Sequence, residues 1–275
     1  MAELTTGLDL PSTQKIAIAV ARQAAEVLLH HFGNNLHESF KISPIDVVTE
    51  ADRQSEAVIV AALQDHFPTF HIVGEEGGGA GAPIAAADYR WYVDPLDGTV
   101  NFANGIPFFC VSLALTDAAM TPLLGVVYNP IADELFTAAR GYGATLNGQP
   151  LRVSVKTSLQ RCVLASGFPY DKHLSPDNNL TEWGNFLLRV RGMRRMGSAE
   201  LDLCYVAAGR FDGYWEAKLN PWDTLAGAMC VLEAGGRVTD YQGQTDPSLY
   251  SRGRVVASNG HIHPQMIAIL NGKNK

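Results

Sequence analysis

The sequence predicts an α+β fold in which helices are laid on sheets. Three observations lead to this prediction: two amphipathic helical patterns open the chain, strand-like runs separated by turn residues follow them, and strands alternate with helical patterns after Leu151. The chain has 275 residues, of which 47% are hydrophobic, so it can bury a full core. We expect one compact unit made of an N-terminal α+β half, residues 1–155, and a C-terminal α/β half, residues 156–275.

The first half is predicted to begin with an amphipathic helix. With Ser12 or Thr13 as its cap, apolar residues recur at helical spacing from Ile16 to Leu28, and Gly33 ends the run. The other elements expected in this half are a helix over 52–65 and strands over 71–73, 109–115, 123–128 and 134–138. Turn residues between the later strands, such as Asn129-Pro130, are typical of antiparallel pairing.

The second half is predicted to alternate strands with helices. The elements expected there are a strand over 163–166, helices over 179–190 and 198–208, a strand over 212–216 and a helix over 222–234. The last helix is almost entirely apolar from Leu225 to Leu232, so we expect it to be buried on most sides. Gly235-Gly236 then ends it.

Composition and charge exclude several classes of protein. The formal net charge is −7, and Lys and Arg are scattered, so we expect no nucleic-acid partner. No apolar stretch is long enough for a membrane span and no N-terminal signal pattern opens the chain, so we expect a cytoplasmic protein without a membrane partner. The cysteines stand singly in apolar surroundings, which favours buried, reduced thiols; they are Cys110, Cys162, Cys204 and Cys230.

The most informative segment runs from Trp91 to Phe102. Here an apolar strand-like run ends in two carboxylates, Asp94 and Asp97, which are three residues apart and flank Pro95. Because Pro fixes φ and disfavours a helix before it, both side chains should project from a stiff turn. Carboxylate oxygens suit Mg²⁺, and the following Gly98 lets the backbone approach an anion closely. The segment therefore predicts a place to hold a divalent metal against a phosphate.

Acidic residues occur at four separate places where strands end or helices begin. They are Asp46 with Asp52, Glu75 with Glu76, Asp94 with Asp97, and Asp223. Each has a plain structural alternative when taken alone: Asp52 and Asp223 as acids at helix N-termini, Glu75-Glu76 as a solvated turn, and the Asp94 segment as an Asx turn. These alternatives do not predict all four together, and we expect a single site.

On these motifs the sequence resembles the inositol monophosphatase family of Mg²⁺-dependent, Li⁺-sensitive sugar phosphatases. The resemblance spans nearly the whole chain, and its segments are Gly74 to Glu76, Trp91 to Phe102, Gly197 to Ala199 and Pro221 to Gly227. Leu201 to Glu216 is similar to the bacterial inositol-1-monophosphatase type in particular. The resemblance implies a layered αβαβα sandwich, as in the inositol monophosphatase and fructose-1,6-bisphosphatase superfamily, and a homodimer.

The resemblance also implies two or three Mg²⁺ ions in each active site. Glu75, Asp94 and the backbone carbonyl of Leu96 would hold one ion. Asp94, Asp97 and Asp223 would hold a second, with Asp94 shared between the two. Such a set of oxygens agrees with the preference of Mg²⁺ for octahedral oxygen coordination.

The resemblance assigns catalytic roles to Asp52, Thr99, Glu75 and Asp94. Thr99 would orient the attacking water, and Asp52 would stand behind it as the base. Asp52 also opens a predicted helix, where a carboxylate is favoured by the helix dipole, and the two roles are compatible.

Substrate contacts are implied in the same way. Glu216 would accept hydrogen bonds from the hydroxyls of the substrate, Gly197, Ser198 and Ala199 would line the same side, and the amides of Gly98 and Thr99 would cradle the phosphate. The full set implied to touch substrate is Leu96, Asp97, Gly98, Thr99, Arg194, Gly197, Ser198, Ala199, Glu216 and Asp223.

Two charged residues near this segment have competing interpretations. Arg194 would meet the phosphate or a partner subunit, or form a surface ion pair. Glu200 stands where alanine is more usual in the family, and we interpret it as an acid favoured by the dipole of its own helix.

For His261 and His263, without a third metal ligand nearby, we expect a capping or exposed role.

The function expected from the sequence is hydrolysis of a myo-inositol monophosphate, a small phosphate ester, with Mg²⁺ as cofactor. The alternatives within the superfamily are phosphatases for fructose 1,6-bisphosphate, histidinol phosphate, NADP or 3′-phosphoadenosine nucleotides, because only the residues that bind the alcohol differ. An alternative of another class is a regulatory protein that keeps the fold and binds a protein partner. No Walker-type glycine loop is present, so ATP hydrolysis is not indicated.

Overall fold

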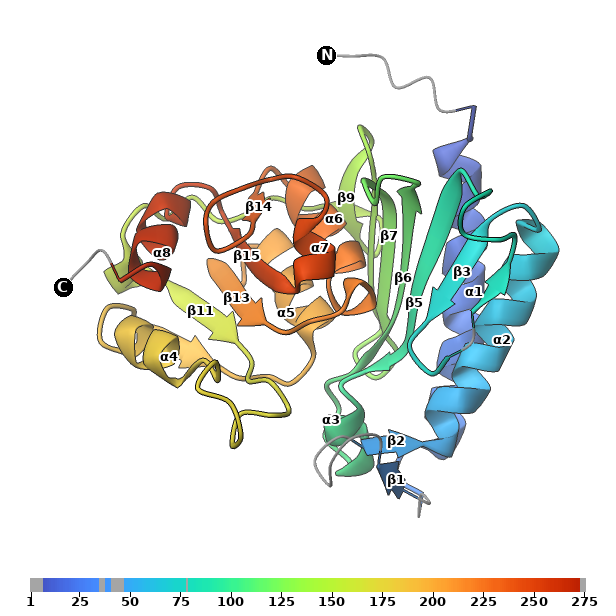
Figure 1. The fold of residues 1–275 in the computed structure, drawn as a ribbon, viewed down its shortest axis with the longest axis horizontal. Helices are drawn as coiled ribbons and strands as arrows, with labels where there is room; N and C mark the ends of the chain where they lie inside the picture. The colour runs from blue at the N-terminus through green and yellow to red at the C-terminus, as the bar shows by residue number, and fades with distance from the viewer. Residues whose placement is uncertain (1–6, 35–37, 41–46, 78, 273–275) are drawn as a thin grey trace.

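Alternating layers of helices and sheets make up the structure (Figure 1). The computed structural model describes residues 7–34, 38–40, 47–77 and 79–272. The helical layers are α1 (Leu10–His31) with α2 (Glu50–His66), then α5 (Ala199–Ala207) with α6 (Leu225–Glu233), and finally α4 (Leu180–Leu187) with α8 (His263–Leu270). An eight-stranded sheet separates the first two layers and a five-stranded sheet separates the last two. The predicted layered α+β fold is confirmed.

The larger sheet is built largely from antiparallel strands, as predicted. Its order is β10-β9-β8-β7-β6-β5-β3-β4, and the parallel pair is β3 with β5. The bounds are β3 (His71–Gly74), β4 (Ala80–Gly81), β5 (Tyr89–Asp97), β6 (Cys110–Asp117), β7 (Pro122–Asn129), β8 (Glu134–Ala139), β9 (Gly143–Leu146) and β10 (Gln149–Pro150). The register of β5 with β6 shifts between Asp94 and Asp97. This irregularity gives the two carboxylates directions that a regular strand would not.

The smaller sheet is mixed. Its order is β12-β11-β13-β15-β14; β12 and β13 run parallel to β11, whereas β15 runs antiparallel to β13 and to β14. The bounds are β11 (Val163–Ser166), β12 (Gly192–Arg194), β13 (Gly213–Ala217), β14 (Arg237–Thr239) and β15 (Arg254–Ser258). The last two strands, α7 (Leu249–Arg252) and α8 were not among the expected elements. Each is short, so its periodicity is weak.

Short elements complete the description. A pair of strands, β1 (Glu38–Phe40) and β2 (Val47–Thr49), lies beside the short helix α3 (Thr99–Ala103), and both are drawn below the larger sheet in Figure 1. Two 3₁₀ turns span Leu159–Arg161 and Pro221–Asp223.

The first helix starts earlier than the sequence predicted. Its N-cap is Asp9, whose carboxylate accepts a hydrogen bond from the amide of Ser12 at 3.3 Å, and Pro11 lies in the first turn. The prediction of Ser12 or Thr13 as cap was wrong because Pro is well accommodated at the start of a helix and extends it toward the N-terminus.

Apolar side chains fill every interface between layers. One cluster joins α1 and α2 to the larger sheet, a central one joins both sheets to α5 and α6, and a third lies under α4 and α8. The helix α6 is buried along most of its length, as predicted, although Leu232 is 38% exposed. The four cysteines are buried and unpaired, which confirms the prediction of reduced thiols.

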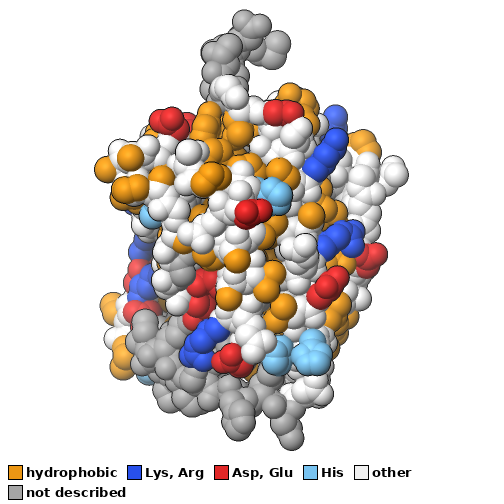
Figure 2. Space-filling model, turned by 90° about the vertical axis from the view of Figure 1, so that its right-hand side faces the viewer, with side chains coloured by type: hydrophobic (Ala, Val, Ile, Leu, Met, Phe, Trp, Pro, Cys, Tyr) orange, Lys and Arg blue, Asp and Glu red, His pale blue; other side chains and the backbone are white. Residues whose placement is uncertain are grey.

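The outer surface carries no uniform charge over the α1 and α2 layer. Figure 2 shows this face, where apolar side chains and side chains of both charge signs are interspersed over its described part. Within the described residues, none of the helices combines the length and the apolar character that crossing a membrane requires.

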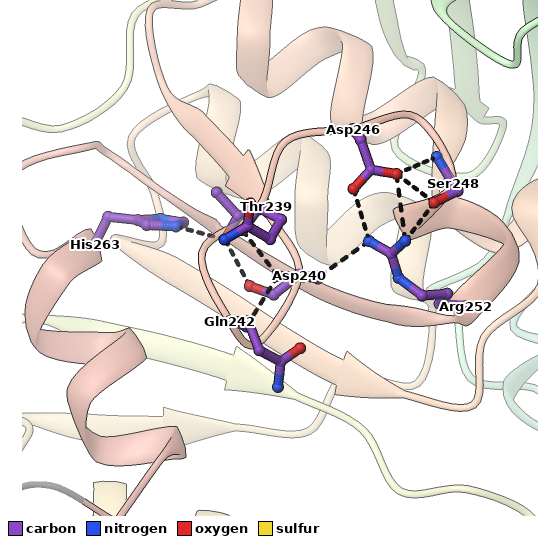
Figure 3. A network of polar contacts seen from close by, with 8 residues as sticks. Thr239, Asp240, Gln242, Asp246, Ser248, Arg252 and His263 are labelled. Carbon is purple, nitrogen blue, oxygen red and sulfur yellow. Dashed lines mark hydrogen bonds and ion pairs between the residues drawn. The ribbon is translucent and has the colours of Figure 1, made fainter.

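His263 is buried, so the expectation that it would be exposed or only cap a helix was wrong. It is 1% exposed, and its Nε2 lies 2.8 Å from Oγ1 of Thr239 (Figure 3) while its Nδ1 lies 2.9 Å from Oγ of Ser258. Thr239 gives its own proton to the carbonyl of Asp240, so Nε2 must donate to Thr239 and Nδ1 must accept from Ser258. Burial, and then the charge of Arg237, lower the pKa of His263 to about 4.

This histidine predicts a pH-dependent contribution to stability. Between pH 6.5 and about 4 the unfolded chain binds a proton at His263 that the folded chain does not, so the folded state loses stability as pH falls through this window. Relative to a His263→Gln variant, the wild type should lose about 2–3 kcal/mol of its free energy of unfolding between pH 7.5 and pH 4. Urea unfolding of both proteins across this pH range measures the difference between their free energies of unfolding. The contributions of the other titrating groups cancel in this difference, because both proteins contain them. A difference that does not change with pH would contradict the assignment.

Candidate active site

Asp94 lies at the centre of the candidate site, near the end of β5. The residue is 2% exposed, and its carboxylate accepts a hydrogen bond from the amide of Leu96 at 2.9 Å. Pro95, which lies between Asp94 and Leu96, is held by a second contact. The hydroxyl of Ser55 on α2 donates to the carbonyl of Pro95 at 3.1 Å. The stiff turn predicted around Pro95 is therefore held by both a local contact and a contact to a distant helix.

Three carboxylates from three separate elements meet here. Oxygens of Glu75, Asp94 and Asp223 lie within 4.8 Å of one another. Glu75 follows β3, Asp94 belongs to β5, and Asp223 ends the 3₁₀ turn before α6. The pKa of Asp94 is raised well above its usual value, first by burial and then by the charges of Glu75, Asp97 and Asp223. Because only oxygens converge and their charges repel, the residues fit a hard divalent cation such as Mg²⁺.

Asp223 reaches this cluster because the helix predicted over 222–234 starts later. The turn Pro221–Asp223 is closed by a capping box, in which the carboxylate of Asp223 accepts from the amide of Asn220 at 2.6 Å. Thr224 then has φ −142, outside the helical region, and α6 begins at Leu225. The predicted start of this helix at residue 222 was therefore wrong, and Asp223 lies in the 3₁₀ turn before α6.

Asp97 joins β5 to the start of α5. Its carboxylate accepts hydrogen bonds from the hydroxyl of Ser198 at 2.6 Å and from the amides of Ala199 at 3.3 Å and Glu200 at 2.8 Å. Burial raises the pKa of Asp97 to about 6, and these hydrogen bonds oppose that rise. The contacts connect the larger sheet to the middle layer beside the three-carboxylate cluster.

Glu200 lies in the first turn of α5, where the interpretation as an acid favoured by the helix dipole places it, but its carboxylate also contacts a second helix. The side chain is fully buried and turns toward the start of α6, where its oxygens accept from the amides of Ala226, at 3.2 Å, and Gly227. The hydroxyl of Ser112 on β6 donates to it at 3.0 Å. Burial and the charge of Asp97 raise the pKa of Glu200 to about 8. It thus caps a neighbouring helix, which sequence position alone does not indicate.

Thr99 and Asp52 are hydrogen-bonded, although 47 residues separate them. Oγ1 of Thr99 lies 3.2 Å from Oδ1 of Asp52 and 3.1 Å from the carbonyl of Leu96. Gly98 precedes Thr99 in a left-handed conformation, with φ 98, and a Cβ there would lie 3.0 Å from the carbonyl of Phe108. Only glycine suits this position, because both its φ and its close backbone contact exclude a side chain.

Glu216, on β13, lies across the pocket. The hydroxyl of Tyr214 donates to Oε2 of Glu216 at 2.6 Å, and a Cβ at Gly167 would overlap both carboxylate oxygens. Burial raises the pKa of Glu216 to about 7, while the hydrogen bond from Tyr214 and the charge of Arg195 lower it.

One pocket contains most of the residues that the sequence singled out. Those lining it are Glu75, Asp94, Leu96, Asp97, Gly98, Thr99, Gly197, Ser198, Ala199, Glu216 and Asp223. Asp52 is buried behind Thr99 rather than in the lining. The lining residues that sequence reasoning missed are Gly167 to Tyr170, Arg195, Asp202 and Ala217 to Asn220. Asp202 could have been noticed, because it is one helical turn beyond Ser198.

Arg194 is not brought to this pocket. Its guanidinium is exposed and donates to the carbonyl of its neighbour Met193 at 2.9 Å, whereas Arg195 lines the pocket. Arg194 ends β12, and Arg195 is the first residue after the strand. The pocket lining therefore includes Arg195 and not Arg194, for which a contact with a partner subunit and a surface ion pair stay the open alternatives.

The model of the inositol monophosphatase family matches residues 9–275. The chain belongs to the inositol monophosphatase family. Its similarity to individual members of the family is high over most of the length of both chains.

Two curated relatives and one solved structure illustrate this similarity. An inositol-1-monophosphatase of Synechocystis sp. is 46% identical over 95% of this chain and 90% of its own. A Nus factor SuhB of Pseudomonas aeruginosa is 43% identical over 89% of this chain and 90% of its own. The structure of an inositol monophosphatase from Anabaena (Nostoc) sp. superimposes with a TM-score of 0.86 at 40% identity, covering 96% of this chain and 97% of that one. Membership of the family supports a phosphatase activity.

Proposed function

We propose that this protein hydrolyses a myo-inositol monophosphate to inositol and phosphate, with Mg²⁺ as its cofactor. The observation that carries the proposal is the meeting of Glu75, Asp94 and Asp223 in the pocket that also contains Gly98 and Glu216. Such a pocket offers oxygens for a divalent metal beside backbone and side-chain groups for an ester.

The metal ligands follow from this arrangement. We assign Glu75, Asp94, Asp97, Asp223 and the carbonyl of Leu96 to two or three Mg²⁺ ions. When bound, the ions would neutralise charge on the phosphoryl group and lower the pKa of a water. Asp97 keeps lone pairs for this role while it accepts hydrogen bonds from the start of α5.

Thr99 and Asp52 act on the attacking water. The hydroxyl of Thr99 donates to Asp52 and so offers its own lone pair toward the pocket, where it can accept a hydrogen bond from water. As the water loses its proton to the oxygen of Thr99, the hydroxyl of Thr99 passes its own proton to the carboxylate of Asp52, which is buried behind it.

The ester is held at both ends. The amides of Gly98 and Thr99 bind phosphate oxygens at the start of α3. On the alcohol side, Glu216 accepts hydrogen bonds from hydroxyls, and Gly197 to Ala199 line the wall beside it.

A panel of phosphate esters tests the proposal. With Mg²⁺, we expect inositol 1-phosphate to be turned over faster than fructose 1,6-bisphosphate, histidinol phosphate, NADP and a 3′-phosphoadenosine nucleotide. Removal of divalent metal with EDTA should abolish activity, and Mg²⁺ should restore it. A preference for a nucleotide by more than about tenfold in kcat/KM would overturn the choice of substrate. Inhibition by Li⁺ is a further expectation from the family.

Replacing Thr99 by Val should lower kcat by about 100-fold, because the variant keeps the size of the side chain and loses the hydroxyl that connects water to Asp52. The apparent affinity for Mg²⁺ should stay within about twofold, since Thr99 contributes no carboxylate. Thr99→Ser is the matched control and should retain most of the activity. Equal losses in the Ser and Val variants would contradict the role of the hydroxyl.

A second candidate is a regulatory role through a protein partner, which the relatives named Nus factor SuhB favour. An Asp223→Asn variant separates the two functions. If it loses phosphatase activity while the phenotype of a deletion strain is still complemented, the regulatory role is supported.

The oligomeric state follows as a proposal from the family. We propose a homodimer, and light scattering of the purified protein measures its mass.

A further inference from the structure

Asp202 is a buried carboxylate without a hydrogen-bonding partner in the described part of the chain. It lies in the first turn of α5 and is 2% exposed. Its Oδ1 is fully enclosed and accepts no hydrogen bond from any described residue. A buried carboxylate that lacks donors is costly, so a native structure normally supplies them from protein, water or ligand.

The other Asp and Glu residues of the described chain that are buried as a whole differ from Asp202 in this respect. Those that accept at least one hydrogen bond are Asp52, Glu56, Asp94, Glu200, Asp212 and Asp240. Asp240 is a clear example, because two backbone amides and the guanidinium of Arg252 donate to it (Figure 3). The difference at Asp202 therefore calls for a donor that comes from outside the chain.

The place of Asp202 indicates what that donor is. Asp202 lines the pocket of the candidate active site together with Glu216 and Arg195. The residues assigned to metal and phosphate come from the larger sheet and the turn before α6, whereas Asp202 and Glu216 come from α5 and β13. An ester with its phosphate at the metal end would turn its alcohol toward Asp202.

The charged groups that affect the pKa of Asp202 lie in the same pocket. Its pKa is raised well above the usual value, first by burial and then by the charges of Glu216 and Asp97, while Arg195 lowers it. Asp202 and Glu216 are thus close enough to repel each other. Both have acceptor capacity for hydroxyl donors, since among the described residues Glu216 accepts a hydrogen bond from Tyr214 and keeps further lone pairs.

We propose that Asp202 is a specificity-determining residue that, beside Glu216, accepts a hydrogen bond from a second hydroxyl of the alcohol, so that the site selects phosphate esters of polyols. This inference rests on the proposed phosphatase function and assigns one more residue to the same site. A hydroxyl that meets Asp202 supplies the donor that the described residues do not provide. An ester whose alcohol lacks that hydroxyl leaves the carboxylate of Asp202 unpaired in the complex. We expect its kcat/KM to be lower by about 10- to 100-fold.

Two esters with the same ring test the proposal. Inositol 1-phosphate carries ring hydroxyls, and cyclohexyl phosphate has the six-membered ring without them. In the wild type with Mg²⁺, kcat/KM should favour the inositol ester. Asp202→Ala should lower kcat/KM for inositol 1-phosphate by about 10- to 100-fold and leave that for cyclohexyl phosphate within about twofold. Asp202→Asn, which keeps one acceptor, should fall between the wild type and the Ala variant.

Binding of inositol itself gives a readout that does not depend on turnover. Saturation-transfer NMR or calorimetry with myo-inositol should show weaker binding in Asp202→Ala than in the wild type. Thermal unfolding without ligand should give a Tm that is equal or higher in both Asp202 variants, because no hydrogen bond from the described chain is lost. The matched control is Asp240→Asn, a buried aspartate with partners, which should lower the Tm and leave the ratio of the two esters unchanged.

The outcomes separate this inference from the proposed function. If the wild type hydrolyses neither ester with Mg²⁺, the phosphatase proposal fails, and the inositol-binding comparison still tests Asp202. If the wild type hydrolyses both esters and Asp202→Ala changes both by the same factor, or neither, the role of Asp202 is overturned and water alone meets its carboxylate. A Tm that drops in both Asp202 variants would likewise show a structural role.

Discussion

Replacing Asp94 by Asn should lower kcat/KM by about 1,000-fold, the largest effect that we expect from any single substitution in this protein. Asp94 belongs to the three-carboxylate cluster with Glu75 and Asp223 and is the most deeply buried of the three. Loss of its charge removes an oxygen ligand that we assign to two ions at once. Activity should stay low at saturating Mg²⁺, and initial rates over a Mg²⁺ titration measure this.

The same variant should be more stable than the wild type when metal is removed. Because like charges and burial raise the pKa of Asp94, removing its charge relieves repulsion that the metal-free fold carries. Melting in EDTA should therefore give a higher Tm for Asp94→Asn, and added Mg²⁺ should raise that Tm less than it raises the Tm of the wild type.

A buried aspartate outside the site is the control for Asp94. Asp212→Asn should show the opposite behaviour, with a lower Tm and an intact response to Mg²⁺, since Asp212 is held by Lys156 at 2.9 Å and by the amide of Val163 at 2.7 Å. Substantial turnover by Asp94→Asn would contradict the assignment of Asp94 as a metal ligand. A rise in Tm with Mg²⁺ equal to that of the wild type would contradict it as well.

Replacing Glu200 by Ala should lower the free energy of unfolding by about 3 kcal/mol, the largest stability effect among our predictions. The substitution leaves the amides of Ala226 and Gly227 and the hydroxyl of Ser112 without their acceptor in a buried place. For a chain of this size, this corresponds to a fall in Tm of about 6–12 °C. Urea unfolding and calorimetry measure both quantities.

A second carboxylate provides the matched control for Glu200. Glu233 also accepts from two backbone amides, those of Gly141 and Gly143, but at a partly exposed place where water can replace it. Glu233→Ala should cost about 1 kcal/mol or less. Equal losses at the two positions would mean that burial of Glu200 has no energetic consequence.

Several elements were predicted closely because their signals are local. The strand Val163–Ser166 has the predicted bounds, and α5 differs from its prediction by one residue at each end. Short apolar runs between turn residues and a Ser cap carry this information within a few positions. The later strands and α8 are short. The pairing of β15 with β13 and the packing of α8 beside α4 were set by residues far away in the chain.

The sequence by itself determined the types of residue available for the chemistry: carboxylates next to Pro and Gly in one stiff turn, a Thr after them, and further acids at Asp52, Glu75 and Asp223. These follow from residue type and local spacing, because both are written along the chain. Only the tertiary structure decided that Arg195 rather than Arg194 lines the pocket, that Glu200 caps α6, and that Asp202 is buried with no donor among the described residues. The partners of a side chain depend on elements that are distant in sequence and on which way each strand or helix turns as the layers pack, and no local pattern contains that information.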